Sequence, residues 1–278
     1  MRFTKMHGLG NDYLYVFGEV PENIEELCVR LSDRHFGAGS DGMIYISPSD
    51  TADFKMRIFN ANGSEANMCG NGIRCVGKYV YDKGYTDKLN LAVETLSGIK
   101  YLKLQVSGGK VRTAAVDMGE ARTQEEIRLE LPGVSKADLK AAGFSGTGFP
   151  DGVPVSVGNP HIVFFVEDAE QFPLETIGPL VEHHSSFPGG VNAEFVQVLS
   201  EAQLRMRVWE RGSQITMACG TGACASVAAA VSKGFCREGL PVTVHLDGGD
   251  LSVTMGKEHR IIMEGPAEFV YEGETIDG

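Results

Sequence analysis

The chain contains 278 residues with a formal net charge of −12, which is enough sequence for one large domain or two of ordinary size. Hydrophobic residues make up 42% of it and charged residues 22%, as in folded globular proteins. The acidic balance, without basic runs, argues against a nucleic-acid partner. No apolar stretch is long enough to cross a membrane, and no signal-peptide pattern is visible, so we expect a cytoplasmic protein with no membrane partner.

Hydrophobic periodicity predicts an α/β chain with two similar halves. In the first half we expect a helix over 22–34, strands over 43–46 and 53–59, a helix over 72–83, and strands over 89–95, 99–106 and 111–117. A composition shift near 118–135 is the expected domain crossing, and Gly- and Pro-rich loops are expected around 143–154 and 185–191. The second half predicts helices over 174–184 and 222–235 and strands over 153–157, 161–166, 194–199, 203–209, 241–246, 250–255, 259–263 and 267–271. The 222–235 helix is apolar nearly all round, which indicates a central helix wrapped by sheet.

A repeat links the two halves. Gly-Ser stands six or seven residues before a Cys-Gly-x-Gly in both 63–72 and 212–222, and the two cysteines are 150 residues apart (219 − 69 = 150). Leu-Gly-Asn-Asp at 9–12 likewise resembles Val-Gly-Asn-Pro at 157–160. Two matches in the same order and at similar spacing favour two related halves, with coincidence among Gly-rich turns as the alternative.

Cys69 and Cys219 each stand at the expected start of a helix. The positive end of a helix dipole stabilises a thiolate and lowers its pKa, and the free N–H groups there bind a carboxylate. Two sulfurs flanking one substrate suit stereoinversion, in which a thiolate removes a proton and a thiol delivers one to the opposite face. Alternatives are a Cys–His hydrolase, which leaves the second cysteine unexplained, and a non-catalytic protein that binds small anions.

The remaining cysteines point to packing rather than chemistry. Reduced thiols are expected in a long chain without an export signal. The spacings C-x5-C and C-x4-C fit structural zinc poorly, so no metal is expected. Small buried hydrophobes are the favoured interpretation for Cys28, Cys75, Cys224 and Cys236.

Polar residues near the repeat are further candidates. His161 follows the second Gly-Asn, and Glu210–Arg211 precede Cys219 where the first half has Asn60 before Cys69. His161 is as consistent with a structural role as with a catalytic one. An Arg can hold a carboxylate through two hydrogen bonds, although a surface charge pair is the plain alternative for Glu210–Arg211.

The chain resembles the diaminopimelate epimerases, cofactor-independent amino-acid epimerases, over almost its whole length. The matching segments are FTKMHGLGNDY at 3–13, DRHFG at 33–37, FNANGSEA at 59–66, MCGNGIRC at 68–75, GNPH at 158–161, VNAEF at 191–195, WERG at 209–212 and ACGTGAC at 218–224. The two cysteine motifs and the Glu-Arg-Gly run are highly specific in combination.

The resemblance implies two pseudo-symmetric domains, residues 1–117 completed by 264–278 and residues 118–263, each a curled, mostly antiparallel sheet around a central helix, with the site in the cleft between them. It implies interconversion of LL- and meso-diaminopimelate without pyridoxal phosphate, other cofactor or metal, in lysine and peptidoglycan-precursor synthesis, and it allows a homodimer. A related racemase of another amino acid, also independent of pyridoxal phosphate, is the near alternative.

Residue roles also follow from the resemblance. Cys69 and Cys219 would be the two proton-transferring groups, with His161 and Glu210 as nearby proton acceptors. The helix starts at Gly70, Asn71, Gly220 and Thr221 would hold the reacting carboxylate. The other substrate contacts implied are Asn11, Gly42, Asn60, Asn159, Asn192, Glu210 and Arg211, with Arg211 on the distal carboxylate. Three places depart from the commoner pattern: Asn62 for Asp, Gly42 where some members have Gln, and Ser213-Gln214-Ile215-Thr216 for x-Gly-Glu-Thr.

Overall fold

The computed structural model describes residues 1–131, 134 and 149–276, so half of the loop expected around 143–154, residues 143–148, lies outside the described residues. The chain forms two compact units, unit 1 with Met1–Asp117 and Glu264–Gly278, and unit 2 with Met118–Met263. The chain passes from unit 1 into unit 2 within β8 (Lys110–Glu120) and returns within β17 (Arg260–Pro266).

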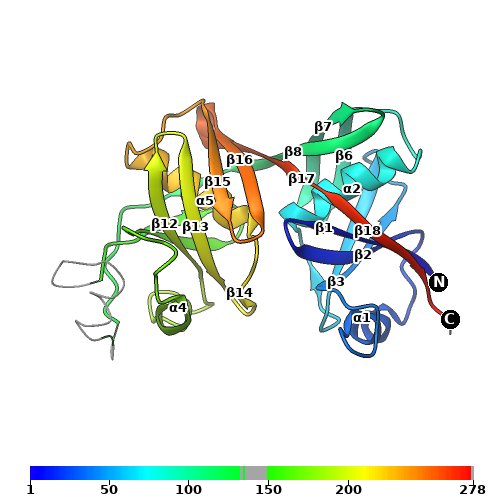
Figure 1. Cartoon of the computed structure of the whole chain (residues 1–278), viewed down its shortest axis with the longest axis horizontal. Coiled ribbons are helices and arrows are strands. Elements are labelled where there is room, and N and C mark those ends of the chain that lie inside the picture. The colour runs from blue at the N-terminus through cyan, green and yellow to red at the C-terminus, as the bar shows by residue number, and fades with distance from the viewer. Residues whose placement is uncertain (132–133, 135–148, 277–278) are drawn as a thin grey trace. The chain divides into compact units, whose positions relative to one another are not determined.

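Unit 1 consists of strands and two helices. Its elements are β1 (Arg2–Gly8), β2 (Asn11–Phe17), α1 (Ile24–Ser32), β3 (Gly42–Ser47), β4 (Phe54–Asn60), β5 (Glu65–Ala66), α2 (Gly70–Asp82), β6 (Asn90–Thr95), β7 (Gly98–Ser107), most of β8, and β18 (Glu268–Glu274). β1 pairs antiparallel with β2 and β18, β2 pairs parallel with β3, and β3 pairs antiparallel with β4. Helix α2 packs against β1, β2 and β7, and α1 packs against β3 and β4 (Figure 1).

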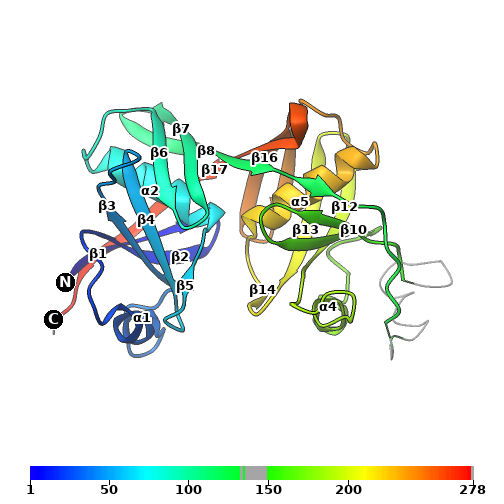
Figure 2. The same cartoon turned by 180° about the vertical axis from the view of Figure 1, so that it is seen from behind.

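Unit 2 repeats this order of elements. After β9 (Arg122–Thr123) come β10 (Val153–Ser156), β11 (Pro160–Phe165), α4 (Leu174–Glu182), β12 (Asn192–Ser200), β13 (Gln203–Glu210), β14 (Gln214–Ile215), α5 (Gly220–Ser232), β15 (Pro241–Leu246), β16 (Gly249–Met255), the 3-10 turn η1 (Lys257–His259), and most of β17. The pairings repeat too: β10–β11 is antiparallel, β11–β12 parallel and β12–β13 antiparallel. The register that joins Ile44 to Ile58 in unit 1 joins Glu194 to Val208 in unit 2. The predicted duplication is therefore confirmed (Figure 2).

The central helix of each unit is buried by the sheet around it. Almost every residue of α5 is buried, and the small side chains of its Ala-rich face allow close packing against β9–β13, β15 and β16. Helix α2 is equally buried although it contains Arg74 and Lys78. Lys78 Nζ donates to Val111 O over 2.6 Å and pairs with Asp82 Oδ2 at 3.0 Å, which offsets the burial of its charge. The expected fold, a curled sheet around a central helix in each half, is confirmed.

A second helix covers the outer face of each sheet. In unit 1, Cys28 and Leu31 of α1 pack with Leu14 and Met43; in unit 2, residues of α4 pack with Phe195 and Trp209. A strand that is covered on both faces loses the alternation of apolar and polar residues. Four consecutive residues of β2 are buried, which explains why β2 was not predicted from the sequence. β1 was not predicted either, although the burial of its residues alternates in part.

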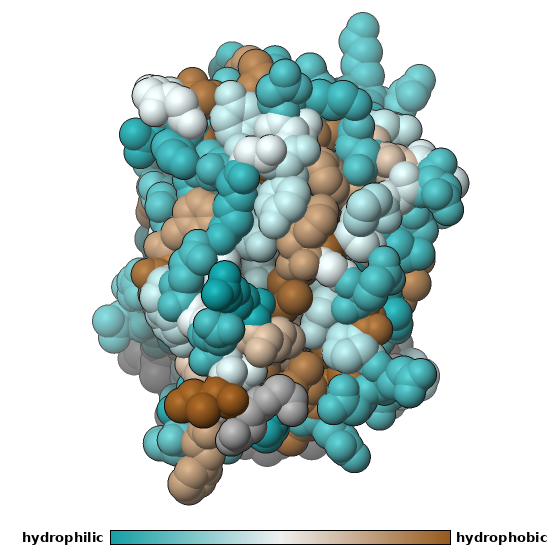
Figure 3. Space-filling view, turned by 90° about the vertical axis from the view of Figure 1, so that its right-hand side faces the viewer, coloured by the Kyte–Doolittle hydropathy of each residue, from teal (hydrophilic) through white to brown (hydrophobic). Residues whose placement is uncertain are grey.

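The other predicted helices and strands are confirmed with shifts of a few residues at their ends. The helices predicted from 72 and 222 start at Gly70 and Gly220, because each preceding cysteine caps its helix. None of the helices in the described part of the chain is long and apolar enough to span a membrane. Hydrophilic residues predominate on the face of the molecule in Figure 3, with apolar side chains between them.

Candidate active-site residues

Cys69 and Cys219 occupy equivalent positions in the two units. Each is the extended residue that caps the following helix, and each Sγ accepts a hydrogen bond over 3.3 Å from a backbone N–H in the first turn, that of Gly72 or Gly222. Each sulfur therefore lies among the free N–H groups of a helix N-terminus, where negative charge is stabilised. This is the local geometry that the Cys-Gly-x-Gly spacing predicts.

In unit 1 the turn between β1 and β2 lies against the start of α2. A Cβ at Gly8 would lie 3.1 Å from Asn71 O, so the close approach favours glycine there. The turn places Asn11 beside the cysteine, and Cys69 Sγ donates to Asn11 Oδ1 over 3.3 Å. Asn11 Nδ2 donates to Asp41 Oδ2 over 2.8 Å, which fixes the amide with its oxygen toward the sulfur.

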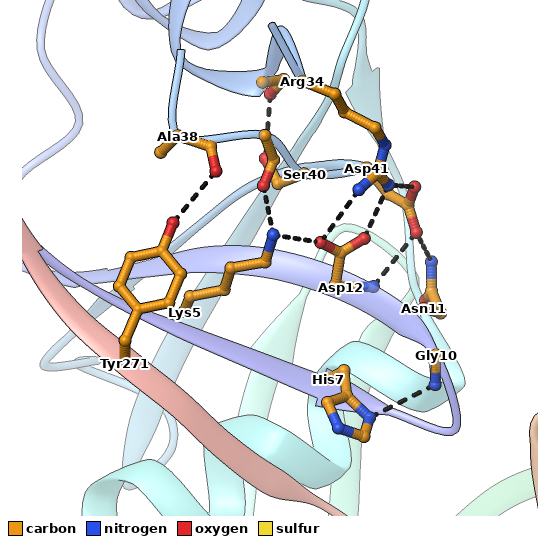
Figure 4. Close-up of polar contacts among 12 residues, drawn as sticks. Lys5, His7, Gly10, Asn11, Asp12, Arg34, Ala38, Ser40, Asp41 and Tyr271 are labelled. Carbon is orange, nitrogen blue, oxygen red and sulfur yellow. Dashed lines mark hydrogen bonds and ion pairs between the residues drawn. The ribbon is translucent and has the colours of Figure 1, made fainter.

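Asp41, which accepts the hydrogen bond from Asn11, belongs to a cluster of charged residues (Figure 4). Arg34 Nη2 bridges Asp12 Oδ1 at 2.8 Å and Asp41 Oδ1 at 2.9 Å, and Lys5 Nζ pairs with Asp12 Oδ2 at 2.7 Å. Burial would raise the pKa of Asp12, but hydrogen bonds from Arg34 and Lys5, with their positive charges, lower it overall. The Asp12 carboxylate is therefore ionised at neutral pH, and its ion pairs hold the β2 end of the turn in place.

Tyr13 is a neighbour of Cys69 that the sequence did not single out. Burial raises the pKa of Tyr13 well above its usual value, and the nearby Cys69 and Asp41 raise it further. The hydroxyl is therefore protonated at any physiological pH. The signal was present, since Tyr13 stands in the unit 1 segment that matches 157–161, at the position that His161 occupies in unit 2.

Gly42 and Asn60 lie on neighbouring strand ends of unit 1. A Cβ at Gly42 would lie 2.0 Å from Phe59 O, so this backbone has no room for the Gln that some relatives have there. Asn60 Nδ2 donates to Ser64 Oγ over 3.1 Å. Asn62 Oδ1 accepts from the backbone N–H of Ser64 over 3.0 Å, and because a carboxylate oxygen can accept in the same way, the departure from Asp leaves the turn intact.

Cys219 lies in a more enclosed and more acidic setting than Cys69. It is 5% exposed, and its Sγ lies 3.6 Å from Thr221 Oγ1. Burial, followed by the charges of Glu210 and Glu194, raises the pKa of Cys219 well above the usual value, against weaker hydrogen bonds from Thr221 and Gly222. Burial likewise raises the pKa of Glu210, partly opposed by a hydrogen bond from Thr216.

His161 lies between two oxygen acceptors. Its Nδ1 is 2.7 Å from Glu194 Oε1, and its Nε2 is 3.0 Å from Asn159 Oδ1. Asn159 Nδ2 donates to Thr221 Oγ1 over 3.4 Å, which links the histidine to the helix start beside Cys219. Glu194 was not among the predicted site residues, because a single Glu in a strand gives no signal of its own.

Asn192 and Arg211 are tied to the backbone of unit 2. Asn192 Nδ2 donates to Pro160 O over 3.0 Å, and Asn192 Oδ1 accepts from Arg211 N over 2.9 Å. The guanidinium of the exposed Arg211 donates to Gly189 O over 3.1 Å. Glu182, in helix α4, holds the same strand end: it accepts from Trp209 Nε1 over 2.7 Å and from Gly212 N over 2.9 Å.

The unusual run Ser213-Gln214-Ile215-Thr216 keeps the loop before Cys219 paired. Glu210 and Trp209 pair with Gln214 and Ile215 of β14, and Thr216 Oγ1 donates to Glu210 Oε1. Gln214 has a φ of +63°, a left-handed conformation that glycine adopts at lower cost. The replacement of the usual glycine is therefore accommodated with strain at one residue.

The remaining cysteines lie inside the units. Cys28, Cys75, Cys224 and Cys236 are all buried, which confirms their predicted packing role, and burial raises the pKa of Cys75 to about 11. Within the described residues, no group of three or more His, Cys, Asp and Glu side chains could hold a metal ion.

Structural comparison places this fold among epimerases and related enzymes. A PhzF-family phenazine biosynthesis protein of Bacillus anthracis superposes with a TM-score of 0.76 at 16% identity, over 99% of both chains. A hydroxyproline epimerase of Agrobacterium vitis superposes with a TM-score of 0.68 at 15% identity, over 98% of this chain and 91% of the other. At such identities the likeness concerns the fold, which is that of a class containing several epimerases and racemases.

Sequence comparison is more specific. The family model for diaminopimelate epimerase matches residues 3–124 and 153–270. Diaminopimelate epimerases of Methanococcus maripaludis and Bacillus subtilis are 51% and 49% identical, over 99% and 98% of this chain and 99% and 97% of their own. The chain belongs to the diaminopimelate epimerase family and is an isomerase. The resemblance noted from the sequence is confirmed.

Proposed function

We propose that this chain interconverts LL- and meso-2,6-diaminopimelate by two-base proton transfer between Cys69 and Cys219. The observation that supports this most directly is the repeated geometry, a cysteine capping a buried central helix in each unit with its sulfur on a first-turn N–H. Paired thiols of this kind suit the transfer of a proton from one face of a carbon to the other. The proposal requires no cofactor and no metal.

The reaction consists of two balanced proton transfers. A thiolate removes the α-proton, so that the Cα–H bond breaks, an S–H bond forms and the electron pair stays on the substrate carbon. The opposite thiol then gives its proton to the other face, so that its S–H bond breaks and a new Cα–H bond forms. N–H groups at the two helix starts, Gly70–Asn71 and Gly220–Thr221, stabilise the charge that spreads onto the α-carboxylate.

Glu210 is suited to take the proton that creates the attacking thiolate in unit 2. Cys219 rests as a thiol because burial and neighbouring carboxylates raise its pKa. Burial raises the pKa of Glu210 as well, which brings its basicity closer to that needed near neutral pH. Binding of substrate supplies the remaining free energy, and exclusion of water strengthens each of these interactions.

Recognition of the second amino-acid group distinguishes diaminopimelate from ordinary amino acids. In the proposal, Arg211 pairs with the distal carboxylate, and Asn11, Asn60, Asn159, Asn192 and Glu210 contact the substrate's polar groups. Gly42 contributes through its backbone, because no side chain fits there. A site with these groups rejects a shorter amino acid, since the buried polar partners would be left unpaired. We extend the proposal to a cytoplasmic homodimer acting in lysine and peptidoglycan-precursor synthesis.

The test is proton NMR of LL-diaminopimelate with reduced, pyridoxal-free protein in D2O. We expect loss of the α-proton signal and appearance of the meso isomer. Cys69→Ala and Cys219→Ala should each abolish the reaction, whereas Cys224→Ala, which removes a buried packing thiol, should retain it.

Two results would contradict the proposal. No exchange by folded, reduced protein would exclude diaminopimelate as substrate, and α-exchange of another amino acid under the same conditions would then favour the related racemase. Full activity of either active-site cysteine variant would exclude the two-thiol mechanism.

A further inference from the structure

A fully buried carboxylate stands beside His161 at a position that the fold does not require to be polar. Glu194 is 0% exposed, and His161 is 1% exposed. In the repeated register, Ile162 pairs with Ala193 as Leu14 pairs with Met43. The unit 1 counterparts of His161 and Glu194 are therefore Tyr13 and Ile44, so the same fold accepts an isoleucine where unit 2 has Glu194.

The position of Glu194 relative to the helix start is also repeated. A Cβ at Gly72 would lie 2.7 Å from Ile44 Cδ1, and a Cβ at Gly222 would lie 2.7 Å from Glu194 Oε1. The carboxylate thus replaces an apolar side chain directly beneath the first turn of α5, close to Cys219. A buried carboxylate is costly unless it is paired, and an apolar residue here would avoid that cost.

His161 is the ion-pair partner of Glu194. The 2.7 Å contact to Nδ1 is the one ion pair that Glu194 makes within the described residues, and Glu194 Oε2 has no hydrogen-bond partner in that part of the chain. The other ring nitrogen, Nε2, faces Asn159 Oδ1, whose amide nitrogen is turned toward Thr221. Two acceptors are satisfied together only when both ring nitrogens are protonated.

We propose that Glu194 is a positioning residue that keeps His161 as an imidazolium, with one N–H directed at Glu194 and the other at Asn159. The carboxylate of Glu194 contacts this cation directly, and that of Glu210 lies near enough to interact with its charge. Its charge offsets that of the Glu194 carboxylate, and its form at rest is a proton donor rather than the acceptor that the family resemblance implies. The catalytic part of this inference rests on the proposed function, whereas the protonation state does not.

Nitrogen NMR of the histidine rings tests the protonation state directly. In protein labelled with 15N-histidine, with the His161 signals identified by their loss in His161→Gln, we expect both His161 nitrogens to be protonated at pH 8. An ordinary histidine, with a pKa of about 6.5, is neutral there. In Glu194→Gln, His161 should become neutral at pH 8, whereas Glu182→Gln, which changes another buried carboxylate of unit 2, should leave it charged.

A neutral ring in the unaltered protein, with Nδ1 protonated and Nε2 accepting, would overturn the inference. This is the state that the opposite orientation of the Asn159 amide would produce. Because the result is obtained on the unaltered protein, it decides the question even where a variant fails to fold.

Kinetics test the catalytic part. Glu194→Gln should lower kcat about ten- to hundredfold, the effect typical of a carboxylate that orients a functional histidine, with a smaller change in KM and a displaced pH profile. Glu194→Asp, which retains the charge, should recover part of the loss.

A double variant separates action through His161 from a merely structural role. In the His161→Gln background, Glu194→Gln should cost no more than about a further twofold, because coupled residues are not additive. Losses that multiply would overturn the positioning role. Absence of epimerase activity in the unaltered protein would instead refute the proposed function and leave the NMR result standing.

Discussion

The two cysteines share a backbone setting but not a chemical one. In unit 1, Cys69 lies beside the amide of Asn11 and the protonated hydroxyl of Tyr13. In unit 2, the equivalent strands bring the ionisable side chains of His161, Glu194 and Glu210 toward Cys219.

This difference shows which part of a duplicated fold is free to diverge. The caps, the Gly-rich first turns and the strand pairings are the same in both units, because they create the helix N-termini that hold the sulfurs. The side chains on the strands beneath are replaced position by position, Tyr13 by His161 and Ile44 by Glu194. In unit 1 the charged side chains are those of Asp12, Arg34 and Asp41, which form ion pairs next to the turn between β1 and β2.

The largest difference in kcat is expected between the variants Gly222→Ala and Gly72→Ala. The new Cβ at residue 222 meets Glu194 Oε1 at 2.7 Å and Cys219 Sγ at 3.2 Å, whereas at residue 72 it meets the end of the Ile44 side chain, which can move. We expect Gly222→Ala to lower kcat about hundredfold, the scale of one lost acid–base contribution, and Gly72→Ala to lower it less. Steady-state assays of both variants measure this, and equal losses would refute the contrast.

The strand ends that precede the cysteines should differ in stability. Glu182→Ala leaves the buried Trp209 indole and the Gly212 N–H without their acceptor, at a cost of about 3 kcal/mol in the free energy of unfolding. Asn62→Ala removes the corresponding turn bonds of unit 1, which are exposed, and should cost less than about 1 kcal/mol. Urea unfolding followed by Trp209, the single tryptophan, compares them; a similar cost for both would contradict the difference.

Alkylation should separate the two thiols. Cys69 is partly exposed, whereas Cys219 is buried with a raised pKa, so iodoacetamide at pH 8 should modify Cys69 first. Glu210→Gln removes a negative charge, lowers the pKa of Cys219 and increases its thiolate fraction, so its alkylation should accelerate several-fold while Cys69 is unchanged. Peptide mass spectrometry measures both rates in one sample, and a slower Cys219 in the variant would show that the sign is wrong.

The smallest effect is expected at Gln214. Its φ of +63° has a cost that glycine avoids, so Gln214→Gly should raise the free energy of unfolding by about 1 kcal/mol. Ser64→Gly, near the matching place in unit 1, has no such strain to relieve and is the control. Thermal unfolding compares the two, and a Gln214→Gly protein less stable than the original would indicate that the side chain contributes more than the strain costs.

Much of the fold could be read from local pattern. The alternating strand β4 and the apolar helix α5 were visible because their burial is one-sided or complete. β2 was not, since four of its consecutive residues are buried and show no alternation. The cysteine caps were recognisable because the Gly residues they need are adjacent in the chain.

Only some residues of the candidate site could be predicted from local sequence patterns. Asn11, Asn159 and the two cysteines stand in repeated turns and could be named from the sequence. Glu194 stands in a strand, where a glutamate has no distinguishing neighbour, and Tyr13 is marked only by its match to His161 in the repeat. Arg34 and Asp41 likewise gained significance only through their contacts with Asp12 and Asn11.

The sequence by itself determined the duplication, the two capped helices and the two candidate sulfurs, because each depends on residues close together in the chain. Only the tertiary structure decided which side chains surround each sulfur. The parallel pairing of β11 with β12 brings Glu194 to His161, residues 33 apart in sequence. Pairing over such a separation is fixed by packing across the whole unit, and no local pattern encodes it.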